Sequence, residues 1–206
     1  GQNLGHPGGI MGLVKQWQAL GPTLTLSRRA AQETGAVFLP PCVDPDAFHQ
    51  VPADPTFACE VCYVGNVLTE REARTRAYLN VAPASLRVYG RSFGRILTQE
   101  ESLRLYSTAQ IGLNFGFEEG GVWDCGIARP FQLAAGGCFV GSDPVPFLCE
   151  TFGECMAFAS PEQSAAVVQE SLRDPRRGER AVAARALMLE KFSPLAVARQ
   201  LLAACA

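Results

Sequence analysis

The sequence predicts an α/β fold with a Rossmann-like parallel sheet of about five strands and helices on both faces. Short apolar runs of strand length alternate with helical patterns through the last two-thirds of the chain. Capping-box pairs and prolines mark the start of several helices, and glycines follow several of the strands. Strands that alternate with helices form βαβ units, and such units build a mainly parallel sheet covered on both faces.

The predicted strands are apolar runs that end at a turn signal or at the start of a helical pattern. They cover residues 59–64, 85–89, 109–115, 138–141 and 155–159.

The helices between these strands are indicated by their ends. Capping boxes pair Thr69 with Glu72 and Thr98 with Glu101, and the second of them opens a helix that runs through Tyr106. A third helix is expected at about 127–135, after a glycine-rich loop over 116–126 and before the terminating pair Gly136-Gly137.

Three further helices are expected in the C-terminal tail, each opened by a polar residue and a proline. They begin at Ser160-Pro161, Asp174-Pro175 and Ser193-Pro194. In the second, an apolar face consists of Val182, Ala186 and Leu189, and in the third we expect the inward-facing residues to be Leu195, Ala198 and Leu202.

The first 57 residues have a different organisation. Two short strands at 23–26 and 36–39 flank a helix that starts at Arg28, and five prolines follow within sixteen residues. Two strands do not form a stable domain alone, and closely spaced prolines stiffen a linker. We therefore expect residues 1–57 to be the remnant of a preceding domain plus a linker, with an exposed apolar face, and residues 58–206 to be a second domain. Because the chain begins at Gly1, we expect a fragment boundary there.

The composition favours a globular protein and disfavours two classes of partner. Apolar residues make up 48% and charged residues 18%, and the formal net charge is −2. Without a run of like charges, we expect neither a nucleic-acid surface nor an anionic-membrane surface. No apolar stretch approaches the roughly 20 residues of a transmembrane helix, and no signal-peptide pattern opens the chain.

Eight cysteines are scattered along the sequence, several of them inside apolar runs. This distribution favours buried, reduced thiols in a cytoplasmic protein. Cys59 and Cys62 have the CxxC spacing, but neither His6 nor His49 supplies a paired ligand nearby. We interpret the CxxC pair as strand residues and expect no metal site.

The topology places several loops around one cleft. In open α/β sheets, ligands bind outside the carboxyl ends of the strands. Gly65-Asn66, Gly90-Arg91 and the loop over 116–126 each follow a predicted strand. We therefore expect these three segments to surround a binding site.

Three segments of the chain resemble a known family. Residues 38–48, with their prolines, are similar to the segment that joins the two Rossmann-like domains of GT-B glycosyltransferases. Cys62-Tyr-Val-Gly-Asn66 resembles the first strand of their C-terminal domain. Ile111-Gly-Leu-Asn-Phe115 and Gly126-Ile-Ala-Arg-Pro-Phe-Gln-Leu-Ala-Ala-Gly-Gly137 resemble their donor site, in the CgeB-like, spore-maturation-type variety that has an Arg-x-Phe-Glu-x-x-Ala-x-Gly-Gly pattern.

This resemblance implies a division of the chain and an activity. Residues 1–57 would be the remnant of the acceptor domain plus the interdomain linker, and residues 58–206 would be the donor-binding, C-terminal half of a GT-B fold. The implied reaction transfers a glycosyl group from a nucleotide-diphosphate sugar to a glycan, a protein or a small molecule. It implies no metal and no cofactor other than the donor substrate itself.

The resemblance also implies roles for individual residues. A helix N-terminus and cationic side chains suit a diphosphate, and we expect that group to contact Gly65, Asn66, Arg71, Gly90, Arg91, Gly126, Ile127, Ala128 and Arg129. Glu118 and Asp124 would act at the donor sugar as candidate catalytic residues. Gln132 would contact the ribose, where the resembling enzymes have a glutamate; a glutamine keeps the hydrogen bond without charge assistance.

Structural roles compete with each of these assignments. Asp124 is equally suited to capping a helix, and Arg129 to an ion pair. Arg71 lies among charged neighbours that are typical of a solvated helix face, and Glu118 is compatible with an ordinary loop charge. At the level of function, a catalytically inactive nucleotide-binding or partner-binding GT-B-like module is the main alternative to an enzyme, and an unrelated flavodoxin-like or epimerase-like sheet protein is a third.

Overall fold

The computed structural model describes residues 18, 23–67, 72–115 and 128–205, and it confirms the predicted fold class. A five-stranded sheet has the order β4-β3-β5-β6-β7, and every neighbouring pair is parallel. Its strands are β3 Val61–Val64, β4 Leu86–Tyr89, β5 Ile111–Asn114, β6 Phe139–Ser142 and β7 Ala157–Phe158.

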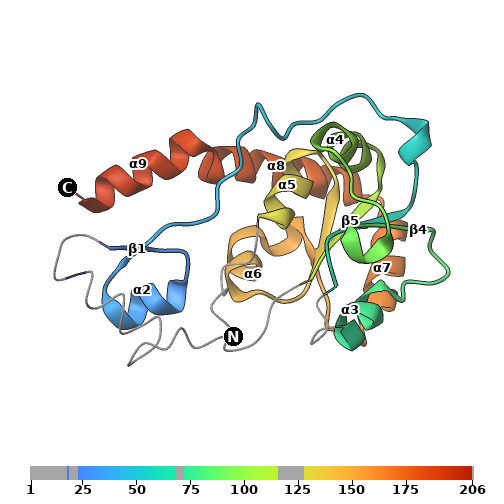
Figure 1. Ribbon diagram of the computed structural model, residues 1–206, viewed down its shortest axis with the longest axis horizontal. Coiled ribbons are helices and arrows are strands. Elements are labelled where there is room, and N and C mark those ends of the chain that lie inside the picture. The colour runs from blue at the N-terminus through green and yellow to red at the C-terminus, as the bar shows by residue number, and fades with distance from the viewer. Residues whose placement is uncertain (1–17, 19–22, 68–71, 116–127, 206) are drawn as a thin grey trace.

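Helices cover both faces of this sheet (Figure 1). Buried side chains of α4, α5, α6 and most of α8 pack in one apolar cluster, and those of α3 and α7 pack in the other. The helices are α3 Glu72–Leu79, α4 Gln99–Thr108, α5 Arg129–Ala135, α6 Pro146–Phe152, α7 Ser164–Arg173, α8 Arg177–Phe192 and α9 Pro194–Cys205. Short 3₁₀ turns lie at Pro55–Phe57, Arg91–Phe93 and Gly153–Cys155.

Local signals determined the ends of several elements as expected. The Thr98 hydroxyl accepts from the Glu101 amide at 3.2 Å, and the Glu101 carboxylate accepts from the Thr98 amide at 2.9 Å, which completes the capping box of α4. Gly137 takes a left-handed conformation (φ 86°) after α5. The Cys138 amide then reaches back to the Leu133 carbonyl at 3.0 Å, so the two glycines end α5 as predicted.

Two helix starts differ from the prediction. Helix α6 was not predicted, because its N-cap residue Val145 has no side chain that accepts a hydrogen bond; Pro146 in its first turn was the one local signal that we did not use. Helix α7 begins at Ser164 instead of at Ser160-Pro161. The Gln163 side chain does reach the Ser160 amide at 3.3 Å, but the residues between them form a turn that precedes the helix.

The apolar faces expected for the two tail helices were wrong in part: Leu189 is partly buried against the core, but the other expected residues are exposed. Helix α8 buries Ala181, Ala184, Met188 and Phe192, while Val182 is 69% exposed. Small residues on the buried side let α8 pack closely against α5, where the Arg185 side chain bonds to the Ala135 carbonyl at 3.1 Å. Helix α9 buries Val197, and the three residues expected to point inward, Leu195, Ala198 and Leu202, are exposed.

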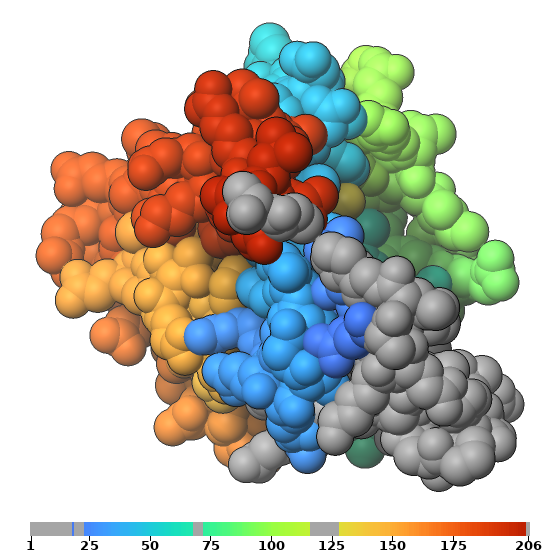
Figure 2. Space-filling view, turned by 90° about the vertical axis from the view of Figure 1, so that its left-hand side faces the viewer, coloured from blue at the N-terminus to red at the C-terminus, as the bar shows by residue number. Residues whose placement is uncertain are grey.

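The N-terminal unit forms a small sheet of its own. Strands β1 (Leu24–Thr25) and β2 (Val37–Phe38) are parallel, and α2 (Arg28–Thr34) connects them. The unit contacts α6 through an Arg28–Glu150 ion pair of 2.7 Å and a Phe38–Phe147 ring contact of 5.5 Å. Figure 2 shows the unit in blue beneath the C-terminal helix α9 in red.

An exposed apolar face was expected on this unit and is present. Leu24 and Leu26 are 44% and 42% exposed. The proline-rich segment that follows is bound to the larger sheet's helices: the Val43 amide donates to the Phe192 carbonyl at 3.0 Å, and the Val51 amide donates to the Ser107 hydroxyl at 2.9 Å. Within the described residues, no helix is both long and apolar enough to span a membrane.

The CxxC cysteines lie where the sequence interpretation put them, at the start of β3. Cys62 is fully buried, and Cys59 is half-buried just before the strand. Burial raises the pKa of the Cys59 thiol to about 12. The neighbouring Cys138 thiol and complete burial raise the pKa of Cys62 well above its usual range. Both groups are therefore protonated at neutral pH.

Alkylation should separate these thiols from an exposed one. The thiolate is the nucleophile, so a raised pKa and burial both slow its reaction. Iodoacetamide at pH 8 should modify Cys42, which is exposed, well before Cys59, Cys62 and Cys138. Peptide mass spectrometry would show the order, and urea-unfolded protein is the control in which all of them react. Equal rates at Cys42 and Cys59 in the folded protein would contradict this assignment.

A glycine in β5 is required by the packing of α5 on the sheet. A Cβ at Gly112 would lie 2.3 Å from Leu133 Cδ2, in the buried core. Gly112→Ala should therefore lower the free energy of unfolding by about 1–3 kcal/mol. In the matched control, Gly178→Ala, the added methyl group meets nothing within 4 Å, and stability should stay constant or rise by up to about 1 kcal/mol. Urea denaturation of both variants would check this, and equal stability would contradict the close α5–sheet contact.

Candidate functional site

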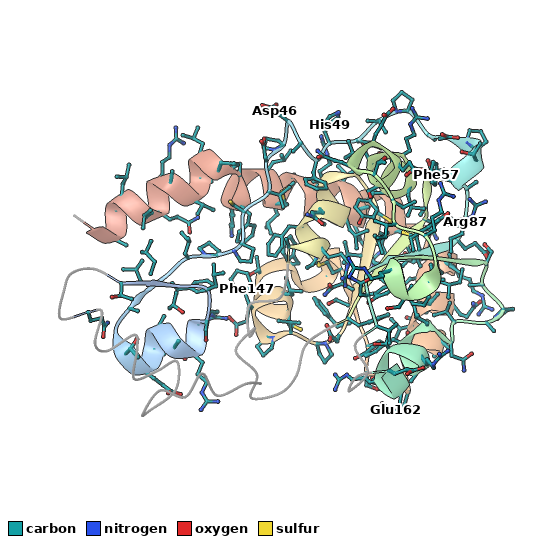
Figure 3. All side chains as sticks on the ribbon, viewed as in Figure 1. Asp46, His49, Phe57, Arg87, Phe147 and Glu162 are labelled. Atoms are coloured by element: carbon teal, nitrogen blue, oxygen red, sulfur yellow. The ribbon has the colours of Figure 1, made fainter. Side chains whose placement is uncertain are left out.

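The strand order predicts a crevice at the carboxyl ends of the strands. The chain leaves β3 toward β4, whereas β5 lies on the other side of β3. Where the order reverses in this way, the loops diverge and leave room for a ligand. In Figure 3, Phe57, which precedes β3, lies near the end of the sheet where the strands begin, and Glu162, which follows β7, lies near the end where they finish. The crevice is expected at the second of these ends.

The Arg129 guanidinium lies across this crevice. Arg129 is the first residue of α5, and its Nη1 is 3.4 Å from Asn114 Oδ1 and 3.4 Å from the Phe115 carbonyl at the end of β5. Its Cζ is 5.1 Å from the centroid of the Tyr63 ring in β3. One cation therefore joins the ends of the two strands between which the order reverses.

Gly65 allows Arg129 to take this position. A Cβ at Gly65 would lie 2.6 Å from Arg129 Nη2 and 2.7 Å from the Tyr63 hydroxyl. Gly90 is needed for the next loop, because its φ of 145° strains other residues and its Cβ would lie 1.9 Å from the Gly65 carbonyl oxygen. The contact of Arg129 with the end of β3 and the contact between the two loops thus both depend on glycine.

The loops after β3 and β4 are joined to each other. The Asn66 Oδ1 accepts from the Arg91 amide at 2.8 Å, and the Ser92 hydroxyl accepts from the Val67 amide at 3.0 Å. The structure therefore brings together Gly65, Asn66, Gly90 and Arg91, as the sequence suggested. The Arg91 side chain itself is exposed.

Sequence reasoning missed a buried polar chain behind Arg129. Asn114 Nδ2 donates to the Ser142 hydroxyl at 3.0 Å, and the Ser142 hydroxyl lies 3.2 Å from Asp143 Oδ1. These three side chains are 2%, 3% and 0% exposed, respectively. The sequence did contain a signal for this chain: a polar residue, Asn114 or Ser142, follows each of two apolar runs at its carboxyl end.

In the described ranges of the chain, the groups around Arg129 leave its charge uncompensated. Both of its hydrogen-bond acceptors are neutral, and both distances are at the long end of the normal range. Among the described residues, no carboxylate lies within ion-pair distance of this guanidinium. The ion-pair alternative for Arg129 therefore gains no support from the part of the chain that the structure describes.

The start of α5 differs from the expected anion site. The helix begins at Arg129 instead of at residue 127, and it is only seven residues long. Pro130 has no amide hydrogen, so it removes one of the backbone donors of the first turn. Ala128 is the N-cap and Gln132 is half-buried one turn along the helix. The Arg129 side chain is a stronger source of positive potential here than the helix end.

Five residues assigned to the site from the sequence lie outside the described residues: Arg71, Glu118, Asp124, Gly126 and Ile127. The described part of the site therefore consists of the ends of β3, β4 and β5 and the start of α5.

The comparisons with known proteins agree with this arrangement. A family model described as glycosyl transferase-like matches residues 68–203, well over half of the chain. No curated protein matches the chain.

Solved structures with the same fold are glycosyltransferases. The enzyme from Rickettsia africae is 13% identical with a TM-score of 0.65, and the match covers 96% of this chain and 66% of that one. Alr3699/HepE from Anabaena, solved in complex with UDP and glucose, is 10% identical with a TM-score of 0.67, over 94% and 65% of the two chains. AviGT4, involved in avilamycin A biosynthesis, is 16% identical with a TM-score of 0.62, over 87% and 61%.

These identities show a shared fold, and the present chain spans about three fifths of the length of AviGT4. The parallel five-stranded sheet with helices on both faces matches the GT-B architecture of these enzymes. With the family model, they give one assignment: this chain belongs to the glycosyl transferase-like family and has a GT-B glycosyltransferase fold.

Proposed function

We propose that the crevice between β3 and β5 binds the diphosphate of a nucleotide-sugar donor, and that the chain is the donor-binding part of a glycosyltransferase. The observation that carries this proposal is the position of Arg129, whose guanidinium crosses the crevice and, in the part of the chain that the structure describes, has only neutral acceptors. A guanidinium binds phosphate oxygens through paired, charge-assisted hydrogen bonds. Residues 1–57 would then be the acceptor-domain remnant and linker, and 58–206 the donor domain.

The chemistry follows from the leaving group. When a glycosyl group is transferred, the nucleoside diphosphate leaves with additional negative charge. A cation held beside the diphosphate stabilises that charge as it develops. Arg129 would perform this role without a metal ion, and the acceptor would be a glycan, a protein or a small molecule.

The neighbouring glycines and loops fit this geometry. The absence of a Cβ at Gly65 lets the guanidinium lie directly against the backbone at the end of β3, where a ligand bound at the strand ends would meet it. Asn66 ties the loop after β3 to the Arg91 amide, so the rim is held in place before a ligand arrives. Less conformational freedom is then lost on binding.

A binding module without turnover is the second candidate. Gln132 favours it, because a glutamine cannot give the charge-assisted ribose bond of a glutamate. The two functions share the nucleotide site and differ in the reaction. Calorimetric titration with UDP, GDP, ADP and their glucose conjugates tests the site, and release of free sugar from a bound conjugate indicates an enzyme. If none of these nucleotides binds, both candidates are wrong.

Removal of the Arg129 side chain should weaken nucleotide binding. Arg129→Ala should cost about 1.5–3 kcal/mol, roughly 10- to 150-fold in affinity for whichever of UDP, GDP and ADP binds, because a charge-assisted contact is lost. The matched control is Arg173→Ala, an exposed arginine at the end of α7 on the opposite side of the sheet. Unchanged affinity in Arg129→Ala would remove this residue from the site.

Restoring a carboxylate at position 132 should strengthen the ribose contact. Gln132→Glu supplies two acceptor oxygens in place of one, and a hydrogen bond to a charged group is worth roughly 1 kcal/mol more than a neutral one. We expect a three- to tenfold gain, about 0.7–1.4 kcal/mol, reduced by repulsion from the diphosphate. The control ligand is the 2′,3′-dideoxy analogue of the nucleotide. An equal change for both ligands would show that residue 132 does not contact the ribose.

A further inference from the structure

The buried chain behind Arg129 has a fixed direction. It runs from Asp143 through Ser142 to Asn114 and ends at the guanidinium, with distances of 3.2, 3.0 and 3.4 Å. Parallel pairing of β5 with β6 places Asn114 beside Ser142, so the register of the sheet holds the middle of the chain. Each of the three buried side chains comes from the carboxyl end of β5 or β6.

The hydrogen-bond capacity of each group determines that direction. The Ser142 hydroxyl donates to Asp143 Oδ1, so its single hydrogen is committed there. The Ser142 oxygen must then accept from the Asn114 amide nitrogen. With its NH₂ group committed to Ser142, Asn114 presents its oxygen to Arg129.

We propose that Asp143 is a positioning residue for Arg129. Acting through Ser142, it keeps the Asn114 oxygen against the guanidinium, so that Arg129 is held over the crevice by a neutral acceptor and keeps its charge for an anion. This inference rests on the proposed diphosphate site. It assigns no contact between Asp143 and the ligand.

The indirect arrangement orients Arg129 without placing a carboxylate in contact with it. A carboxylate in direct contact with Arg129 would form an ion pair, and an anionic ligand would then have to compete with it. A neutral amide oxygen orients the guanidinium at a smaller electrostatic cost to the ligand. Since the acceptor distances to Arg129 are long, a phosphate can draw the guanidinium away from these acceptors without breaking a strong bond.

Loss of the acceptor at position 143 should reverse the chain. Asp143→Ala removes the acceptor of the Ser142 hydroxyl, which frees that hydroxyl to donate to the Asn114 oxygen. Asn114 would then turn its NH₂ group toward Arg129, and two donors would face each other. The affinity for UDP, GDP or ADP, whichever binds, should fall by about tenfold, and the ¹⁵Nε–¹H cross-peak of Arg129 should shift.

Controls separate positioning from stability. Asp46→Ala makes the same change at an exposed site on the proline-rich segment, at the upper edge of Figure 3, and should leave affinity and cross-peak unchanged. Ser142→Ala breaks the chain without altering Asp143, whereas Ser142→Thr retains the hydroxyl and should keep wild-type affinity. The double variant Ser142→Ala/Asp143→Ala should bind the nucleotide no more weakly than the weaker-binding single variant, because both changes interrupt one chain.

Two results would overturn the inference. One is an unmoved Arg129 cross-peak in a folded Asp143→Ala protein. The other is an additive loss of affinity in the double variant. If Asp143→Ala does not fold, the Ser142→Ala and Ser142→Thr pair decides instead, and equal affinities for the two would overturn the proposal. If the wild-type protein binds none of the three nucleotides, the proposed function fails, while the cross-peak still tests the chain.

Discussion

The parallel pairing of β3 with β4 on one side and with β5 on the other is the constraint on which the rest of the structure depends. It directs consecutive connections to opposite sides of β3, and the loops therefore separate where β3 and β5 end. Helix α5 then begins close to that point, because β5 and α5 are consecutive and pack together through Gly112 and Leu133. Arg129 reaches the crevice as a result of this packing.

A cation at such a position has to be held without being neutralised. The protein uses an amide oxygen and a backbone carbonyl for this purpose, together with the face of the Tyr63 ring. The ring itself stacks on Phe115 at 5.6 Å, which in turn stacks on Tyr78 at 3.9 Å. Arg129 thus rests on a rigid aromatic support, and its positive charge remains directed to the crevice.

The sequence predicted those features that are encoded locally. Strands β3, β5 and β6 are continuous apolar runs because helices bury both of their faces, and the Thr98–Glu101 capping box involves only neighbouring residues. The resemblance that singled out Arg129 also depended on one short segment. Features that depend on distant partners were not predictable in the same way. Helix α6 has no capping side chain, and its burial depends on contacts with the rest of the core.

Two errors show the same limit in detail. Helix α8 carries two apolar stripes with helical spacing, and only packing on α5 and β6 decides that Ala184 is buried and Val182 exposed. Asn114 and Ser142 are 28 positions apart, so their hydrogen bond can be predicted only when the register of β5 and β6 is known.

A crystal structure of the protein with bound UDP, GDP or ADP is the most direct test of the site. The account predicts the diphosphate in contact with the Arg129 guanidinium, outside the carboxyl ends of β3 and β5; a diphosphate bound elsewhere on the chain would contradict it.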